Sequence, residues 1–444
     1  MSSHPSTAET IQAALERLSR LHPKKIDLSL GRIERLLDAL GRPQDRLPPV
    51  IHIAGTNGKG STAAFLKAIS EAAGERCHVY TSPHLVRFNE RIVLAGEIVD
   101  DARLEDAFAR CEAANGDHEI TFFEITTAAA FLLFSETPAD RLILETGLGG
   151  RVDATNVLAK PQCTVITPVS LDHQDFLGDV ISDIAAEKAG IIKQGVPVIV
   201  GPQTPDAEAA IRRAAERLKA PLSIWEQDFR AYTEHGRLVF EAEDELWDLN
   251  PPSLAGSHQI INAGVAAATA RACGYSPEAV STGLETARWP ARLQRLSDGL
   301  LADIIAEGEG ALWLDGGHNL SAAESLASSL GEMEAGRERP LVLICAFSKN
   351  KDATGFLAYF EGLAARVIAI DFQGGREGAQ SPGAVTEAAR KAGLPAQTAS
   401  DLTEAVRDAI SDYPGARVVI CGSLYLAGQV LALNENGSVQ STPG

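Results

Sequence analysis

The sequence predicts an α/β protein with a large N-terminal domain, built on a mostly parallel sheet, and a smaller C-terminal α/β domain. Short apolar runs alternate with helical stretches along the chain. This order is typical of parallel βαβ units whose helices cover both faces of a sheet. A glycine-rich turn joins the first apolar run to a helix, and the alternation begins afresh after the segment RWPARLQRLSDG. We therefore place a domain boundary near residue 295.

The composition is that of a globular protein, with 444 residues, 45% hydrophobic residues and a formal net charge of −19. The charge argues against a nucleic-acid partner, which would require clustered Lys and Arg. Small anionic substrates stay possible, since a few local cations can hold them. The six cysteines are scattered without a CxxC pair and are expected to be reduced. Because we find no signal-peptide pattern and no membrane-spanning apolar run, we expect a cytoplasmic protein without membrane contact.

Each domain contributes four strand candidates in chain order. In the first domain, residues 1–295, they are the apolar runs at 50–55, 141–147, 163–170 and 196–201, with a helix predicted over 61–74. In the second domain, residues 296–432, they are the runs at 311–317, 340–348, 366–372 and 417–423. The remaining segment, 433–444, is predicted to be a flexible tail. A cleft between two such domains is a favoured ligand site.

The turn after the first strand has the layout of a phosphate-binding loop. Gly55 ends the apolar run, TNGKGST follows, and a helix begins directly afterwards. Backbone N–H groups at such a helix N-terminus can face phosphates, and Lys59 and Ser61 would reach the phosphates and Mg²⁺. The spacing departs from the usual G-x-x-x-x-G-K-[ST], because Gly60 separates the lysine from the serine. A simple strand–turn–helix connection would also account for the glycines.

Two further strand ends carry polar residues that suit a nucleotide site. Glu145 follows one apolar run, and Asp172, His173 and Asp175 follow another. The carboxyl ends of parallel strands share one edge of a sheet, and ligands bind at that edge. A lone buried histidine or strand-end glutamate is commonly structural, but three such strand ends together indicate a nucleotide and metal site.

With these motifs in view, the chain resembles the Mur ligase superfamily and, within it, the folylpolyglutamate synthase/dihydrofolate synthase enzymes. The resemblance runs from KIDLSLGRIERLLDALG to CGSLYLAG and includes GTNGKGS, TSPHLVRFNERI, LETGLGGRVDATN, DHQDFLG, IAAEKAGIIK and LDGGHN. It implies a P-loop-type N-terminal domain and a Rossmann-like C-terminal domain. It also implies an ATP-dependent amide ligase that adds L-glutamate to dihydropteroate and to reduced folates through an acyl phosphate.

The resemblance assigns roles to positions that match these motifs. The implied ATP-binding residues are Gly58, Lys59, Gly60, Ser61, Asn262, Arg292 and Asp315. The implied ligands of two Mg²⁺ ions are Ser61, Ser82, Glu145, His173 and a carbamylated Lys188. The implied pteroate-binding residues are Leu28, Ser29, Leu30, Thr121, Phe122, Phe123, Glu124 and Asp153. The residues expected to act in catalysis are Lys59, Lys188, Asp315 and His318. The family further implies a monomer.

Several of these positions have a second interpretation. Lys188 could be a solvated helix lysine, and Asp315 could be the N-cap of the following helix. His318 could position the nucleotide rather than accept a proton, and the two phenylalanines could be core residues. Gly317 and Ala291 are small-for-small departures from the family pattern. Asn350 stands where an aspartate is common, which leaves the roles of Lys349 and Lys351 open.

Three other functions compete with the bifunctional ligase. The chain could be a folylpolyglutamate synthase only. It could add an amino acid to a UDP-muramoyl substrate, although only 54 residues precede Gly55, whereas a UDP-binding domain would need roughly 100. It could also be a nucleotide-dependent regulatory protein, although such a protein would not need a second domain that bears DGGHN.

Overall fold

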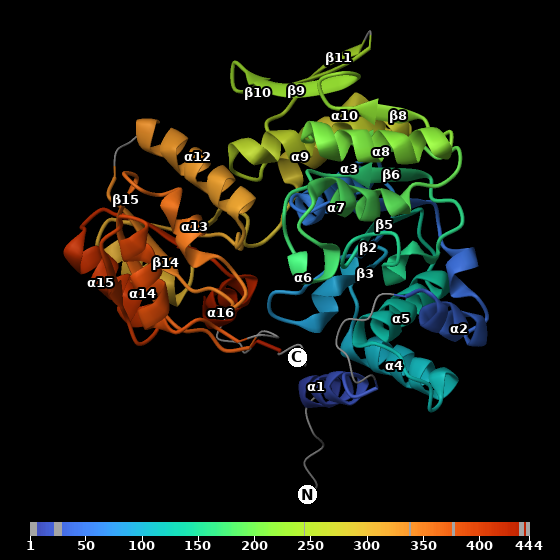
Figure 1. Cartoon of the computed structure of the whole chain (residues 1–444), viewed down its shortest axis with the longest axis horizontal. Coiled ribbons are helices and arrows are strands. Elements are labelled where there is room, and N and C mark those ends of the chain that lie inside the picture. The colour runs from blue at the N-terminus through green and yellow to red at the C-terminus, as the bar shows by residue number, and fades with distance from the viewer. Residues whose placement is uncertain are drawn as a thin grey trace, which may run out of the picture.

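The structure is a computed structural model that describes residues 7–21, 29–243, 245–336, 339–374, 378–434 and 439–440. Within these residues, two large α/β units lie side by side, and a small antiparallel sheet sits at the far end of the first (Figure 1). The predicted α/β class with a mostly parallel first sheet and a second α/β sheet is confirmed. No described helix has the length and apolar character that crossing a membrane requires.

The first sheet has eight strands. The two short strands at one edge, β3 and β4, are antiparallel, and all the others are parallel. In spatial order the strands are β4 (Glu97–Ile98), β3 (Ile92–Leu94), β2 (Cys77–Tyr80), β5 (Arg141–Glu145), β1 (Val50–Ala54), β6 (Cys163–Ile166), β7 (Val198–Val200) and β8 (Leu222–Ile224). Strands β1, β5, β6 and β7 coincide with the four apolar runs predicted in this half.

Helices cover both faces of this sheet, as a continuous apolar strand pattern requires. One face packs against α1 (Thr7–Leu18), α2 (Gly31–Ala39), α4 (Asp101–Asn115), α5 (Phe122–Glu136), α7 (Ile181–Lys188) and α8 (Pro205–Arg217). The other packs against α3 (Lys59–Ala72), α9 (Ser257–Ala272) and α10 (Pro277–Thr286). Along β1, Val50 and Ala54 enter the first layer, and Ile51 and Ile53 enter the second. The remaining helical turns are η1 (Pro43–Arg46), η2 (Phe88–Arg91), η3 (Ala154–Val157), α6 (Gln174–Leu177) and η4 (Ala189–Ile191).

The three-stranded antiparallel sheet was not predicted from the sequence. It consists of β9 (Phe229–Glu234), β10 (Arg237–Ala242) and β11 (Glu245–Leu249), and it covers α9 (Figure 1). A side chain on Gly264 of α9 would place its Cβ 2.7 Å from the Cβ of Ala231. Only glycine therefore lets the small sheet pack this close to the helix.

The second large sheet has six strands, parallel except for the edge strand β12. In spatial order they are β12 (Gln294–Leu296), β13 (Ala311–Leu314), β17 (Arg417–Cys421), β14 (Leu341–Cys345), β15 (Ala364–Ala369) and β16 (Ala396–Thr398). One face packs against α11 (Leu300–Glu307), α15 (Leu402–Asp412) and α16 (Leu424–Asn434). The other packs against α12 (Leu320–Gly336), α13 (Ala353–Ala358) and α14 (Pro382–Lys391).

The predicted tail contains two structured parts. Its first two residues belong to α16, and Gln440 docks on the first domain, where its N–H donates to the Val86 carbonyl and its side chain accepts from the Phe88 N–H. Residues 435–438 and 441–444 lie outside the described residues. All six cysteines are free, and all except Cys273 are buried.

Candidate active site

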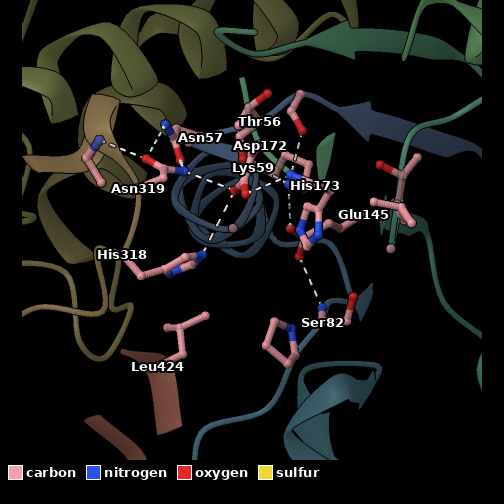
Figure 2. Close-up of a pocket in the computed structure, with 18 of the residues that line it drawn as sticks. Thr56, Asn57, Lys59, Ser82, Glu145, Asp172, His173, His318, Asn319 and Leu424 are labelled. Atoms are coloured by element: carbon pink, nitrogen blue, oxygen red, sulfur yellow. Dashed lines mark hydrogen bonds and ion pairs between the residues drawn. The ribbon is translucent and has the colours of Figure 1, made fainter. Parts of the chain in front are cut away.

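A cavity of about 610 Å³ opens between the two large sheets, at the carboxyl ends of β1, β5, β6 and β13. Figure 2 shows side chains from both units pointing into it. The predicted residues that line it are Ser29, Gly58, Lys59, Gly60, Ser61, Ser82, Thr121, Phe123, Glu124, Glu145, Asp153, His173, Lys188, Asn262, Arg292, Asp315 and His318. Leu30 and Phe122 do not line it and pack with the core cluster under α5 instead. Leu28 lies outside the described residues.

The glycine-rich loop wraps around the N-terminus of α3, which begins at Lys59 itself. Gly58 precedes the helix with φ +88°, a left-handed conformation that only glycine adopts without strain. A Cβ on Gly58 would lie 2.3 Å from the Asn262 amide oxygen. Lys59 Nζ folds back and donates to the carbonyls of Gly55 and Thr56, each at 3.1 Å. The loop therefore presents a cation and the first N–H groups of a helix at one point, which suits a polyphosphate.

The carboxylate of Glu145 lies beside this lysine at the end of β5. Its Oε1 is 3.9 Å from Lys59 Nζ, and its Oε2 accepts from the Ser82 N–H at 3.2 Å. Burial raises the pKa of Glu145, although the charge of Lys59 opposes this shift. A further cation beside such a buried carboxylate would stabilise its charged form.

Lys188 contacts the same loop, and His173 lines the same cavity. Lys188 is buried at the end of α7 and donates to the Gly55 carbonyl at 2.9 Å. Burial, reinforced by the charge of Lys59, lowers the pKa of Lys188 to about 7. Burial also lowers the pKa of His173 to about 4, with Asp172 opposing and Lys351 reinforcing the shift. Both groups therefore have a large neutral fraction near pH 7, and the interpretation of Lys188 as a solvated lysine is wrong.

The donor set fits a divalent ion that keeps part of its shell for water and phosphate. Two serine hydroxyls and the Glu145 carboxylate line the cavity, with the His173 ring nearby. Within the described residues, no group of three His, Cys, Asp or Glu side chains forms a complete cage. Mg²⁺ is commonly held by one or two carboxylates together with substrate phosphates, so a sparse oxygen-rich set of this kind suits it.

The nucleotide side of the cavity combines residues of both units. Asn262 of α9 lies over Gly58 and donates to Gln259, whose own amide donates to Ser61 Oγ at 3.3 Å. Asp315 follows β13 and accepts from the N–H groups of Leu293 and Gly317. It is not the N-cap of α12.

Asn319 has that capping role, because its Oδ1 accepts from the Ala322 N–H at 2.9 Å. The neighbouring His318 contacts the Gly316 carbonyl through Nδ1 at 3.0 Å. A carbonyl can only accept, so Nδ1 carries the proton and the lone pair of a neutral ring lies on Nε2. Burial lowers the pKa of His318, which favours this neutral form.

The other end of the cavity has an unpartnered acceptor. Glu124 Oε2 accepts from the N–H and hydroxyl of Thr121 and from Arg32 Nε at 3.0 Å. Its second oxygen, Oε1, is buried without a hydrogen-bond partner in the described structure. Because an orphaned buried acceptor is costly, it is suited to a donor group on a ligand. Phe123 lies next to it, with its ring against Gly147, whereas Phe122 packs edge-on against Phe88 in the core.

The carboxylate of Asp153 is already well satisfied by the protein. It accepts from the N–H groups of Gly147 and Leu148 through Oδ2, and from the N–H and hydroxyl of Thr155 through Oδ1. Burial raises the pKa of Asp153 against these bonds. Asp153 therefore shapes the wall of the cavity by tying the loop after β5 to η3.

The structure also joins Asp172, one of the strand-end candidates from the sequence, to residues without an assigned role. Asp172, Asn57, Asn319 and Lys351 form a polar network across the cavity mouth, with dashed contacts drawn in Figure 2 for the first three. Three of them lie inside the quoted motifs, next to residues with an implied ligand role. Their position beside such residues could have indicated a role in the site. No local pattern in the sequence, however, shows which of these side chains contact each other.

Known proteins match the chain over nearly its whole length. Residues 53–270 match the family described as Mur ligase middle domain, and residues 301–433 match the family described as dihydrofolate synthetase, C-terminal domain. The chain is 36% identical over 341 residues to the dihydrofolate synthase/folylpolyglutamate synthase of Bacillus subtilis (strain 168), covering 73% of this chain and 76% of the relative.

Two solved structures have the same fold. FolC of E. coli in complex with DHPP and ADP matches with a TM-score of 0.86 at 29% identity, over 98% of this chain and 99% of that chain. A bifunctional folylpolyglutamate synthase/dihydrofolate synthase with Mn, AMPPNP and L-glutamate bound matches with a TM-score of 0.82 at 32% identity, over 95% and 97%.

Proposed function

Because the chain belongs to the dihydrofolate synthase/folylpolyglutamate synthase family of the Mur ligase superfamily, we propose that it is an ATP-dependent ligase that joins L-glutamate to dihydropteroate and to reduced folates. The observation that carries this proposal is the convergence of Lys59, Glu145 and Lys188 on one loop in a cleft with His318 opposite. A UDP-muramoyl substrate is disfavoured, because the second domain matches the dihydrofolate synthetase family.

The first step is phosphoryl transfer, in which the protein mainly positions groups and balances charge. The substrate carboxylate attacks the γ-phosphorus of ATP, the bond to the β,γ-bridging oxygen breaks, and ADP leaves an acyl phosphate behind. Lys59 and the loop N–H groups balance the charge on the phosphates, while Asn262, Arg292 and Asp315 hold the nucleotide. Divalent ions held by Ser61, Ser82, Glu145, His173 and Lys188 would add charge neutralisation.

Lys188 would serve such an ion as a carbamate. An ammonium group repels a cation, whereas a neutral amine can attack CO₂, lose a proton and become an anionic oxygen donor. The buried position of Lys188 and its pKa of about 7 favour the neutral amine that this reaction needs.

The second step is attack of the glutamate amine on the acyl phosphate, which expels phosphate through a tetrahedral intermediate. The ammonium form of glutamate must first lose a proton, and the lone pair on His318 Nε2 would accept it; the contact of Nδ1 with the Gly316 carbonyl supports this tautomer. At the pteroate end, Glu124 Oε1 would accept an N–H of the pterin edge and Phe123 would supply an apolar face.

The decisive assay measures phosphate release with ATP, each acceptor and glutamate. Release that needs both the acceptor and glutamate supports the ligase, and product from tetrahydrofolate but not dihydropteroate would leave a folylpolyglutamate synthase only. We expect Lys59→Met to lower kcat about a hundredfold or more. Lys67→Met, on the same helix in an exposed pair with Glu71, should retain activity. ATP hydrolysis that ignores both co-substrates would instead indicate a regulatory nucleotide-binding protein.

We further propose that the enzyme acts as a monomer in the cytoplasm, without a nucleic-acid partner. The net charge of −19 and the unpaired cysteines support this proposal. Light scattering of the purified protein would test the oligomeric state.

A further inference from the structure

The two units meet at the mouth of the cleft through side chains that have no ligand role in the proposed reaction. Asp172, in the segment between β6 and α6, accepts from Lys351 Nζ at 2.7 Å and from Asn319 Nδ2 at 3.0 Å. Asn319 Nδ2 also donates to Asn57 Oδ1 at 3.1 Å, inside the phosphate-binding loop. Figure 2 shows Asn57, Asp172 and Asn319 meeting from opposite sides of the cleft. One carboxylate thus ties two segments of the second unit to the first.

These contacts hold the junction through polar atoms rather than apolar packing. The side chains of Asp172 and Lys351 are only 11% and 15% exposed, so the ion pair is largely desolvated. Leu171 and Leu320, which flank the junction on its two sides, are 49% and 43% exposed. Since these two leucines bury little apolar surface, this junction itself is held by its polar contacts, while Leu85 and Ala255 pack against the second unit elsewhere.

The junction also determines where His318 lies. Asn319 places its Oδ1 at the N-terminus of α12, which turns its NH₂ group toward Asp172 and Asn57. His318 precedes Asn319 directly, and its Nε2 lies 4.0 Å from Asp172 Oδ2. Any rotation of the second unit that breaks the contacts of Asn319 therefore carries His318 away from the loop.

We propose that Asp172 is a positioning residue which, through Lys351 and Asn319, holds the second unit at the angle that brings His318 to the phosphate-binding loop. The catalytic consequence rests on the ligase function proposed above, whereas the geometric role does not. In the proposed reaction His318 accepts the proton of the glutamate amine, so the use of glutamate depends on this angle. The nucleotide contacts of the loop and of Asn262 lie within the first unit and are independent of this angle, whereas the contact of Asp315 depends on it.

Lys351→Met removes the positive partner of the ion pair, which belongs to the second unit and lies outside the phosphate-binding loop. We expect kcat/KM for glutamate to fall about tenfold to a hundredfold, because one charge of a desolvated pair is left unmatched. ADP affinity should fall by a clearly smaller factor, because the loop and Asn262 keep their nucleotide contacts within the first unit. Lys351→Arg, which keeps the charge, should restore most of the loss. Lys349→Met, an exposed lysine two residues earlier, should match the wild type.

Asn319 gives a second, independent pair of variants. Asn319→Asp keeps an oxygen for the N-cap of α12 but opposes the carboxylate of Asp172, whereas Asn319→Ser keeps a cap without added charge. We expect the aspartate variant to lose more glutamate-dependent activity than the serine variant, with equal helix content by circular dichroism. Wild-type glutamate-dependent activity in the aspartate variant would overturn the proposal, since that variant keeps the cap but loses the amide contacts with Asp172 and Asn57.

Small-angle X-ray scattering of the ligand-free proteins measures the relative placement of the two units independently of catalysis. We expect the profiles of Lys351→Met and Asn319→Asp to show a larger radius of gyration than those of the wild type and Lys349→Met. Unchanged profiles would overturn the positioning role, as would a loss of ADP affinity that parallels the loss of kcat/KM. A changed profile in a protein without ligase activity would refute the proposed function but support the role of Asp172.

Discussion

Replacing Gly58 with alanine tests whether the phosphate-binding loop works through its backbone conformation. Gly58 has φ +88°, and its Cα faces the amide of Asn262. The new methyl group would lie 2.3 Å from Asn262 Oδ1, so one of the two residues must move. Asn262 is buried and donates to Gln259 at 3.0 Å, so it cannot yield without losing a hydrogen bond.

The expected cost has two parts. A non-glycine residue in the left-handed region costs about 1–2 kcal/mol, and the lost or strained amide contact adds about 1 kcal/mol. We therefore expect Gly58→Ala to lower the free energy of unfolding by about 2–3 kcal/mol. Because the loop N–H groups would no longer point at one position, ADP affinity should fall at least about tenfold.

Gly74→Ala is the matched control. Gly74 has a similar φ of +82° at the end of α3, but a methyl group there would meet nothing within 4 Å. Urea unfolding should show a cost of about 1–2 kcal/mol for this variant, and calorimetric titration should show unchanged ADP affinity. Wild-type ADP affinity in Gly58→Ala, or equal stability losses in the two variants, would refute the argument.

Two further predictions concern buried polar groups elsewhere. Burial, aided by Lys193, lowers the pKa of His52 from 6.5 to about 3, so between these pH values the unfolded chain binds a proton that the folded chain does not. Stability should therefore fall as the pH drops below about 6.5, by about 1.4 kcal/mol per pH unit, and the urea midpoint of His52→Gln should fall less steeply; parallel slopes would contradict this. Glu124→Gln replaces one of the two acceptor oxygens beside Arg32 with an NH₂ donor, so pteroate affinity measured by fluorescence titration should weaken about tenfold. ADP affinity should not change, and Glu136→Gln, on the same helix but exposed, should leave both affinities intact; equal effects of the two variants would contradict the assignment.

The fold class was accessible from the sequence because its signals are local. Runs such as VIHIA and RLILE carry apolar residues at successive positions, which indicates strands covered on both faces, and they form neighbouring strands in the first sheet. The three-stranded sheet over α9 escaped prediction, because charged residues interrupt the apolar pattern of its strands. The turn at Gly58 was equally predictable, because closely spaced glycines indicate a backbone that other residues adopt only with strain.

The adjacent residues Phe122 and Phe123 show where local signals end. Both begin α5, and nothing in their neighbourhood in the chain distinguishes them, yet one packs in the core and the other lines the cavity. Successive helix positions point about 100° apart, so the docking of the helix on the sheet decides which ring faces the ligand. Asp315 is a similar case. The sequence offered it as the N-cap of α12, but Asn319 is the cap.

By itself, then, the sequence determined the alternation of strands and helices, the loop conformation and the residue types placed at strand ends. Each of these depends on side-chain period or turn chemistry over a few residues. Only the tertiary structure decided that Asp172 meets Lys351, 179 positions away, and that Asn57 meets Asn319, 262 positions away. Such pairings depend on how two separately formed sheets pack against each other, which no short segment encodes.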